Sequence, residues 1–287
     1  NQSEIKKLFQ KKENSPLSLV RIAINFNNVL ESEPIARELK DMGYMVALNM
    51  MQAHGKSEKD YIETAKIIFS WNVIDVLYFA DSLGNMVPED VEKICKALKK
   101  GWGLPLGIHT HNNKNLALIN SITAVENGVT WCDGTITGMG RGAGNVSTES
   151  LILEMSRLGY HGGQANMIQA VVEDFTILKN KYDWGSNLYY HYAANHGIHP
   201  TFVQSLLKDR RYDNQQVLGA LEFLADQDST AYSTDAVRQA IYGNQRDVDG
   251  VWDATGWMAG TESLIIGAGP SGNKYKDGIL QYIEKEK

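Results

Sequence analysis

Residues 74–111 read IDVLYFADSLGNMVPEDVEKICKALKKGWGLPLGIHTH, with an apolar run at each end and a charged, periodic segment between them. The run at 74–80 is rich in β-branched and aromatic residues and predicts a strand, and 104–111 predicts a second one. Pro88 is a typical first helical residue, and the segment from there to Lys100 has helical spacing of its apolar positions. This order predicts two parallel strands joined by a crossover helix.

The same alternation extends to both sides of this unit. Further strands are predicted at 19–24, 44–49 and 129–137, and further helices at 33–42, 59–71, 115–126 and 148–158. Five such units in succession fit either a doubly wound sheet or a (β/α)₈ barrel, and periodicity alone does not choose between them. Helical, aromatic-rich segments follow from 166 to 242. A short apolar run then leads into GAGPSG at 267–272 and a helix, which predicts the start of a Rossmann-like unit.

Composition excludes several classes of protein. The 287 residues carry a net charge of −6, and the pI is about 5.7, which argues against a broad nucleic-acid or anionic-membrane surface. No apolar run approaches the roughly 20 residues of a membrane helix. Two cysteines, Cys95 and Cys132, are too few for a disulfide framework or a zinc cluster, so a cytoplasmic location is expected.

The triplet His109-Thr110-His111 is the strongest candidate for chemistry. Residues i and i+2 of a strand point to the same side, so both imidazoles can ligate one divalent metal ion. The carboxyl end of a strand is also where α/β folds place their active sites. Two unrelated histidines at a strand end are the alternative interpretation.

Two loops at the same predicted rim contain further candidates. Gly138-Met-Gly-Arg-Gly-Ala-Gly-Asn145 has four glycines, which allow backbone N–H groups to approach a ligand, and Arg141 can bind a carboxylate. Asp81 and Ser82 follow the strand at 74–80. The alternatives are a flexible surface turn for the first loop and capping of the next loop for the second.

These motifs, in this order, closely resemble the DRE-TIM metallolyase superfamily, with the 4-hydroxy-2-oxovalerate aldolases as the nearest members. The resemblance covers residues 19–158, and a weaker match over Trp184–Leu207 resembles the helical domain of those aldolases. It implies a (β/α)₈ TIM barrel of which strands four to eight are present and the first three are missing. It also implies three domains: the C-terminal part of the barrel at 1–160, a helical region at 161–243, and a linker with the start of a Rossmann-like domain at 244–287.

The resemblance further implies a divalent cation, Mn²⁺ or Mg²⁺, with His109 and His111 as ligands and Asn145 as a third one. Asp81, Ser82 and Arg141 would bind substrate, and Tyr189 or Tyr190 would reach the site from the helical region. The Asp-Arg motif on the family's first strand is not found in this sequence. We therefore expect these 287 residues to be inactive alone.

The expected function is an aldolase-type lyase that acts through the enolate of a 2-oxo acid such as pyruvate. Its partners would be small 2-oxo acids and aldehydes, with homo-oligomers or a partner domain possible and neither nucleic acid nor membrane involved. The alternatives are a Claisen-type acyl transferase or CoA lyase, a catalytically silent barrel that supports a nucleotide-binding domain, and a protein whose function lies in that domain. His191, His196 and His199 do not share one helical face and are predicted to be structural.

Overall fold

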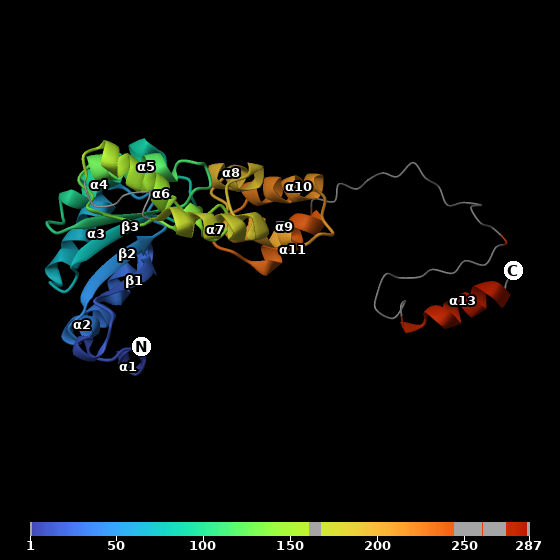
Figure 1. Cartoon of the computed structure of the whole chain (residues 1–287), viewed down its shortest axis with the longest axis horizontal. Coiled ribbons are helices and arrows are strands. Elements are labelled where there is room, and N and C mark those ends of the chain that lie inside the picture. Colours follow the sequence, from blue (N-terminus) through green and yellow to red (C-terminus); the bar gives the residue numbers. More distant parts are fainter. Residues whose placement is uncertain (1, 161–167, 244–259, 261–273, 286–287) are drawn as a thin grey trace. The chain divides into compact units, whose positions relative to one another are not determined.

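The computed structural model describes residues 2–160, 168–243, 260 and 274–285, and the chain divides into two compact units, Asn1–Gln245 and Arg246–Lys287 (Figure 1). The first unit contains a parallel five-stranded sheet in the order β1-β2-β3-β4-β5. Its strands are β1 (Leu19–Asn25), β2 (Met45–Met51), β3 (Val76–Asp81), β4 (Leu106–Thr110) and β5 (Trp131–Cys132).

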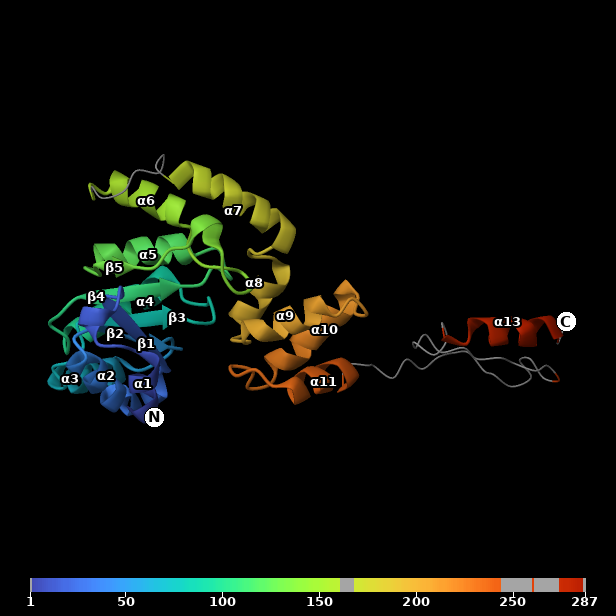
Figure 2. The same cartoon turned by 60° about the horizontal axis from the view of Figure 1, so that its bottom comes forward.

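Helices alternate with the strands, as the sequence predicts (Figure 2). They are α1 (Gln2–Leu8), α2 (Glu33–Asp41), α3 (Glu58–Ser70), α4 (Pro88–Lys99), α5 (Ala117–Glu126) and α6 (Thr148–Arg157). Local sequence sets their ends: Ser57 and Asp60 form a reciprocal capping box on α3, and Pro88 is the first residue of α4.

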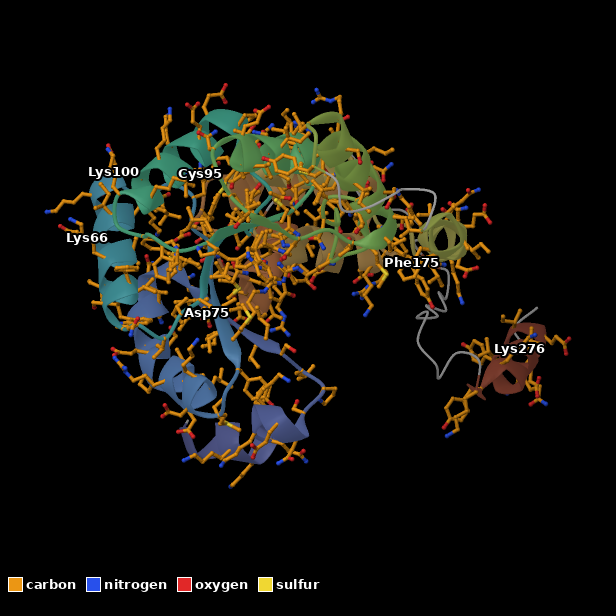
Figure 3. The ribbon with its side chains drawn as sticks, turned by 60° about the vertical axis from the view of Figure 1, so that its left-hand side comes forward. Lys66, Asp75, Cys95, Lys100, Phe175 and Lys276 are labelled. Carbon is orange, nitrogen blue, oxygen red and sulfur yellow. The ribbon has the colours of Figure 1, made fainter. Side chains whose placement is uncertain are left out.

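One face of the sheet packs against these helices. Every second side chain of the central strands points to this face and is buried in the main hydrophobic cluster. Examples are Leu48 of β2, Phe79 of β3 and Ile108 of β4. Cys95 of α4 lies in the same cluster, whereas Lys66 and Lys100 point outward from the helix layer (Figure 3). Strands in chain order with helices on one face are the arrangement of a barrel wall, and this excludes a doubly wound sheet.

The opposite face of the sheet carries polar side chains beside a small apolar cluster, and the sheet is strongly curled. Arg21 of β1 donates to Asp133, directly after β5, with 2.5 Å between Nη1 and Oδ2. In a flat sheet four strand spacings would put these residues roughly 19 Å apart, too far for the two side chains to meet. The curl therefore brings the first and last strands of the sheet face to face across its inner side.

The last strand is shorter than the sequence predicts. A strand at 129–137 is wrong beyond Cys132, because Ile136–Gly138 form a short 3₁₀ helix, η3, and Thr137 has a left-handed backbone with φ of 54°. Thr135 still bridges to Ser147, so the chain turns back over the carboxyl end of the sheet. This turn places the glycine-rich loop beside β4.

Residues 169–243 form the predicted helical region. Its helices are α7 (Gln169–Tyr182), α8 (Leu188–Asn195), α9 (Pro200–Lys208), α10 (Asn214–Ala225) and α11 (Thr234–Gly243). Phe202, Val203, Leu206, Leu221 and Leu224 build a second hydrophobic cluster within it. In the second unit α13 (Lys276–Lys285) is described, and the predicted GAGPSG turn lies outside the described residues. Within the described part of the chain, no helix is both long and apolar enough to cross a membrane.

Candidate active site at the carboxyl end of the sheet

The two histidines of the triplet lie side by side, as strand periodicity predicts. The ring centroids of His109 and His111 are 5.0 Å apart at an angle of 84°. Thr110 between them points the other way and is buried, with its hydroxyl against Ser121 of α5 at 3.1 Å. Strand alternation thus directs Thr110 toward α5 and directs both histidines to the inner side of the sheet.

Gly107 precedes the triplet on the same inner face, and its lack of a side chain has a local cause. A Cβ at this position would lie 2.5 Å from three carbons of the Tyr78 ring. Tyr78 is only 4% exposed and packs with Ala47 and Val76 in a small cluster on the inner face. The glycine is therefore required for β4 to lie against this ring.

Asp133 holds the first histidine. Its Oδ2 lies 2.7 Å from Nδ1 of His109 and also accepts the hydrogen bond from Arg21. Burial opposes ionisation of Asp133, but the hydrogen bonds from His109 and Arg21 outweigh it and lower the pKa of the carboxyl. An ionised carboxylate has no hydrogen to donate, so Nδ1 of His109 is the donor, and in the neutral form of this imidazole the lone pair is on Nε2.

Asn145 lies beside the second histidine. The two residues form an isolated antiparallel bridge, and Asn145 donates from Nδ2 to the Met139 carbonyl at 3.3 Å. Its Oδ1 is buried and has no hydrogen-bond partner among the described residues. Burial, with the charges of His109 and Arg141 adding to it, lowers the pKa of His111 to about 4. The imidazole is therefore neutral at pH 7, the form that a metal ion requires.

The glycine-rich loop packs against the helical region. Gly142 has φ of 63°, and a Cβ there would lie 2.8 Å from the Tyr190 ring. Tyr190 is buried, whereas Tyr189 is half-buried and packs in the helical cluster. Of the two predicted tyrosines, Tyr190 is thus the one against the loop. Arg141 is exposed, and no ion pair joins it to a carboxylate within the described residues.

Further contacts fix the helical region to this rim. Trp184 donates from Nε1 to the Thr137 carbonyl at 3.2 Å, and Ser186 donates to the Asn113 carbonyl at 2.7 Å. A cavity of about 490 Å³ opens here, with Asn145, Thr137 and Trp184 in its wall. The residues that line this cavity do not include His109, His111 or Arg141.

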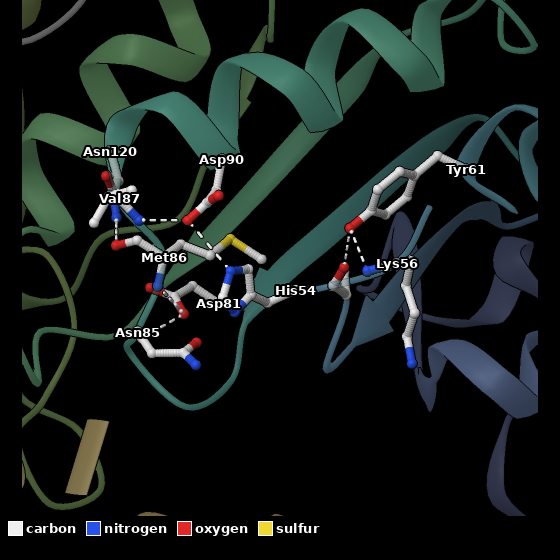
Figure 4. Close-up of polar contacts among 10 residues, drawn as sticks. His54, Lys56, Tyr61, Asp81, Asn85, Met86, Val87, Asp90 and Asn120 are labelled. Atoms are coloured by element: carbon white, nitrogen blue, oxygen red, sulfur yellow. Dashed lines mark hydrogen bonds and ion pairs between the residues drawn. The ribbon is translucent and has the colours of Figure 1, made fainter. Parts of the chain in front are cut away.

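Asp81 is the last residue of β3 at the same rim, where Asn85 and Met86 surround it (Figure 4), and Ser82 follows it in the chain. Asp81 is 1% exposed; its Oδ1 accepts from the backbone of Asn85 and Met86, and its Oδ2 has no partner among the described residues. Burial raises its pKa to about 6, and the backbone hydrogen bonds from Met86 and Asn85, with the charge of His54, oppose this only in part. Ser82 accepts the Gln52 amide at 2.8 Å, so its oxygen supports a turn.

Sequence reasoning missed three residues of this region, Arg21, Tyr78 and Asp133, which line the inner face of the sheet. His199, predicted to be structural, precedes α9 as its N-cap. His199 has its pKa lowered by burial and by the charge of Arg141, which places it within electrostatic reach of the loop. A charged residue inside the apolar run LVRIAIN was the available signal for Arg21.

The donors at this rim suit a divalent metal ion in type. His109 offers Nε2, His111 is neutral, and the buried Oδ1 of Asn145 lacks a partner. Imidazole nitrogen and amide oxygen are ligands of Mn²⁺ and related ions. Within the described ranges no group of three or more His, Cys, Asp or Glu side chains gathers as a complete metal site. The described residues at the rim therefore include donor atoms of types that bind metal ions, and they do not form a complete metal site.

Comparison with known proteins identifies the family. The HMGL-like family matches residues 19–173. A 4-hydroxy-2-oxovalerate aldolase from Geobacillus genomosp. 3 is 36% identical over 158 residues, which are 55% of this chain and 47% of that protein. The chain thus spans about half the length of the curated relatives it matches.

Solved structures share the fold. The N-terminal domain of a candidate aldolase from Bacteroides vulgatus superposes with a TM-score of 0.61 at 28% identity, over 74% of this chain and 78% of that one. The carboxyl transferase domain of Rhizobium etli pyruvate carboxylase superposes with a TM-score of 0.68 at 16% identity, over 84% and 45%. The family match covers more than half of the chain and includes both histidines, so the chain belongs to the HMGL-like family of DRE-TIM metallolyases.

Proposed function

We propose that this chain carries the metal-binding side of a divalent-metal-dependent aldolase that cleaves or forms a carbon–carbon bond through the enolate of a 2-oxo acid such as pyruvate. The observation that supports the proposal is that His109, His111 and Asn145 lie next to one another at the rim of the sheet and that Oδ1 of Asn145 is buried with no partner among the described residues. Members of the family are typically metal-dependent.

A bound Mn²⁺ or Mg²⁺ would act as a Lewis acid that stabilises the negative charge of the enolate. Cleavage of a 4-hydroxy-2-oxo acid removes the hydroxyl proton, breaks the bond between C3 and C4, and releases an aldehyde and the enolate, which takes up a proton at C3. We assign the proton donor to Tyr190 in preference to Tyr189. Burial raises the pKa of the Tyr190 phenol against the opposing charge of Arg141, so the phenol is protonated at neutral pH.

The proposed substrate is more acidic than a simple oxo acid. Arg141 stands exposed in the glycine-rich loop and, within the described residues, has no carboxylate partner, so its guanidinium is available for a substrate carboxylate. Asp81 and Ser82 would bind hydroxyl groups from the opposite side of the rim. Replacing Arg141 with Ala should raise KM for substrates with a second acidic group, whereas an unchanged KM for every acidic substrate would contradict this assignment.

The proposed domain arrangement follows the sequence prediction. Residues 1–160 would form strands four to eight of a (β/α)₈ barrel, 161–243 a helical region that closes its rim, and 244–287 a linker with the start of a further domain. The remaining ligand would be the Asp of the family's Asp-Arg motif. The contacts of Trp184 and Ser186 with the rim support the aldolase type over the acyl transferase type.

The deciding experiment measures exchange of the pyruvate methyl hydrogens in deuterated water by proton NMR, with the intact protein and added Mn²⁺. Exchange that depends on Mn²⁺ and is lost in H111N would support the proposal. A protein that binds Mn²⁺ but exchanges no hydrogen would lack the enolisation step. Absence of both binding and exchange would favour the scaffold alternative.

A further inference from the structure

One carboxylate oxygen ties together the two ends of the curled sheet. Oδ2 of Asp133 lies 2.7 Å from Nδ1 of His109 and 2.5 Å from Nη1 of Arg21. The three side chains are one-third exposed or less, at 22% for Asp133 and His109 and 33% for Arg21. Partial burial strengthens such charge-assisted hydrogen bonds, because water competes less for each partner.

Arg21 is itself held in place on the inner face. Its guanidinium carbon lies 4.9 Å from the centroid of the Tyr78 ring, and this ring lies against Gly107. The aromatic face and the carboxylate together fix the direction of the guanidinium. Arg21 therefore acts on His109 only through Asp133.

The consequence concerns the proton of a neutral imidazole. Neutral imidazole carries one hydrogen, on Nδ1 or on Nε2, and the partner of one nitrogen decides the state of the other. Because the carboxylate accepts from Nδ1, the lone pair of Nε2 is directed away from Asp133. Carboxylate partners of this kind orient the histidine ligands of metal ions.

We propose that Asp133, held by Arg21, is a positioning residue that keeps the proton of His109 on Nδ1 and thereby presents Nε2 to a divalent cation. The part concerning the cation rests on the proposed function. The part concerning the proton depends only on the geometry of the inner face.

The first test uses the ¹⁵N-labelled chain without metal at pH 8. Long-range ¹H–¹⁵N correlation spectra distinguish the two neutral tautomers, and the H109Q variant identifies the signals of His109. We expect the Nδ1-protonated pattern in the unmodified chain and a shift toward the Nε2-protonated form in D133A. An Nε2-protonated His109 in the unmodified chain would overturn the proposal.

The second test titrates the intact protein with Mn²⁺ and follows the free ion by EPR. D133A should weaken Mn²⁺ binding by about 10- to 100-fold, and R21M should weaken it less. D75A is the matched control, because Asp75 pairs with Lys40 at 2.7 Å and accepts the Val46 amide at the opposite end of the sheet. It should leave both the tautomer and Mn²⁺ affinity unchanged.

The outcomes separate this inference from the proposed function. If the unmodified protein binds no Mn²⁺, the proposed function fails, and the NMR experiment still decides the tautomer. If it binds Mn²⁺ and D133A binds equally tightly, the positioning role is overturned, even if the tautomer changes. If D133A does not fold, D133L, which keeps a side chain of similar volume and removes both acceptor oxygens, replaces it with the same expected direction in both measurements.

Discussion

Adding a single methyl group at Gly107 tests the packing beneath the candidate site. In G107A the new Cβ would lie 2.5 Å from three carbons of the Tyr78 ring, whereas ordinary van der Waals contact begins at 3.4 Å. The ring would have to move by about 0.9 Å to restore that contact. It is 4% exposed, and Arg21 lies over it, so no open space receives it.

The expected cost follows from two opposing effects. Overpacking of a filled core typically costs ~1–3 kcal/mol. Replacing Gly with Ala also restricts the unfolded chain, which returns about 0.4–1 kcal/mol. We therefore expect G107A to lower the free energy of unfolding by about 1–2 kcal/mol.

The assay is urea unfolding followed by circular dichroism, with the slope of the transition compared between variants. G103A is the matched control, because its Cβ would find only the Phe69 ring at 3.8 Å. It should be as stable as the unmodified chain or slightly more stable. In a Y78A background, which lacks the ring, G107A should cost nothing. G107A as stable as G103A, or equal costs with and without the ring, would refute this reasoning.

Three further predictions concern pH and the loop. Because the folded-state pKa of His111 is about 4, below the ordinary 6.5, stability present above pH 6.5 is lost as the pH falls toward 4. In H111N this loss in the free energy of unfolding should be smaller by about 3 kcal/mol, measured by urea unfolding at pH values from 8 to 4. An H111N variant whose stability falls with pH as steeply as that of the unmodified chain would contradict this. The raised pKa of Asp81, about 6, acts oppositely, with stability lost as the pH rises from 3.8 through 6. D81N should therefore gain stability relative to the unmodified chain between pH 4 and pH 8, and a constant difference would refute this. G142A, which places a Cβ against the Tyr190 ring, should slow exchange of the pyruvate methyl hydrogens by about 100-fold. G55A is the control, because Gly55 has a similar φ and open space around it, and it should leave the rate unchanged. Equal exchange rates in the two variants would refute this prediction.

The sequence predicts those features that depend on local periodicity. The alternation of strands and helices is confirmed from 19 to 157, and the shared orientation of His109 and His111 follows from strand geometry alone. The prediction of a strand up to 137 overlooks Asp133-Gly134, a pair typical of turns that directly follows the end of β5 at Cys132. The left-handed backbone at Thr137 depends on contacts of the loop.

The partners of the site residues depend on packing between distant segments. Arg21 and Asp133 are 112 positions apart, and they meet only because the sheet curls. Tyr189 and Tyr190 differ by one position on α8, so only the packing of that helix against Gly142 decides which one reaches the loop. Sequence periodicity contains neither the curvature of the sheet nor the rotation of a docked helix.

Because Asp133 contacts both Arg21 and His109, the orientation of His109 depends on the curvature of the sheet. A movement that flattens the sheet by a few ångströms separates β1 from the end of β5, and the carboxylate cannot follow both partners. If the proposed metal site is present, mutations in the helix layer, far from the rim, would change metal affinity by altering the curvature of the sheet. The orientation of the His109 imidazole therefore depends on how strongly the five-stranded sheet is curved.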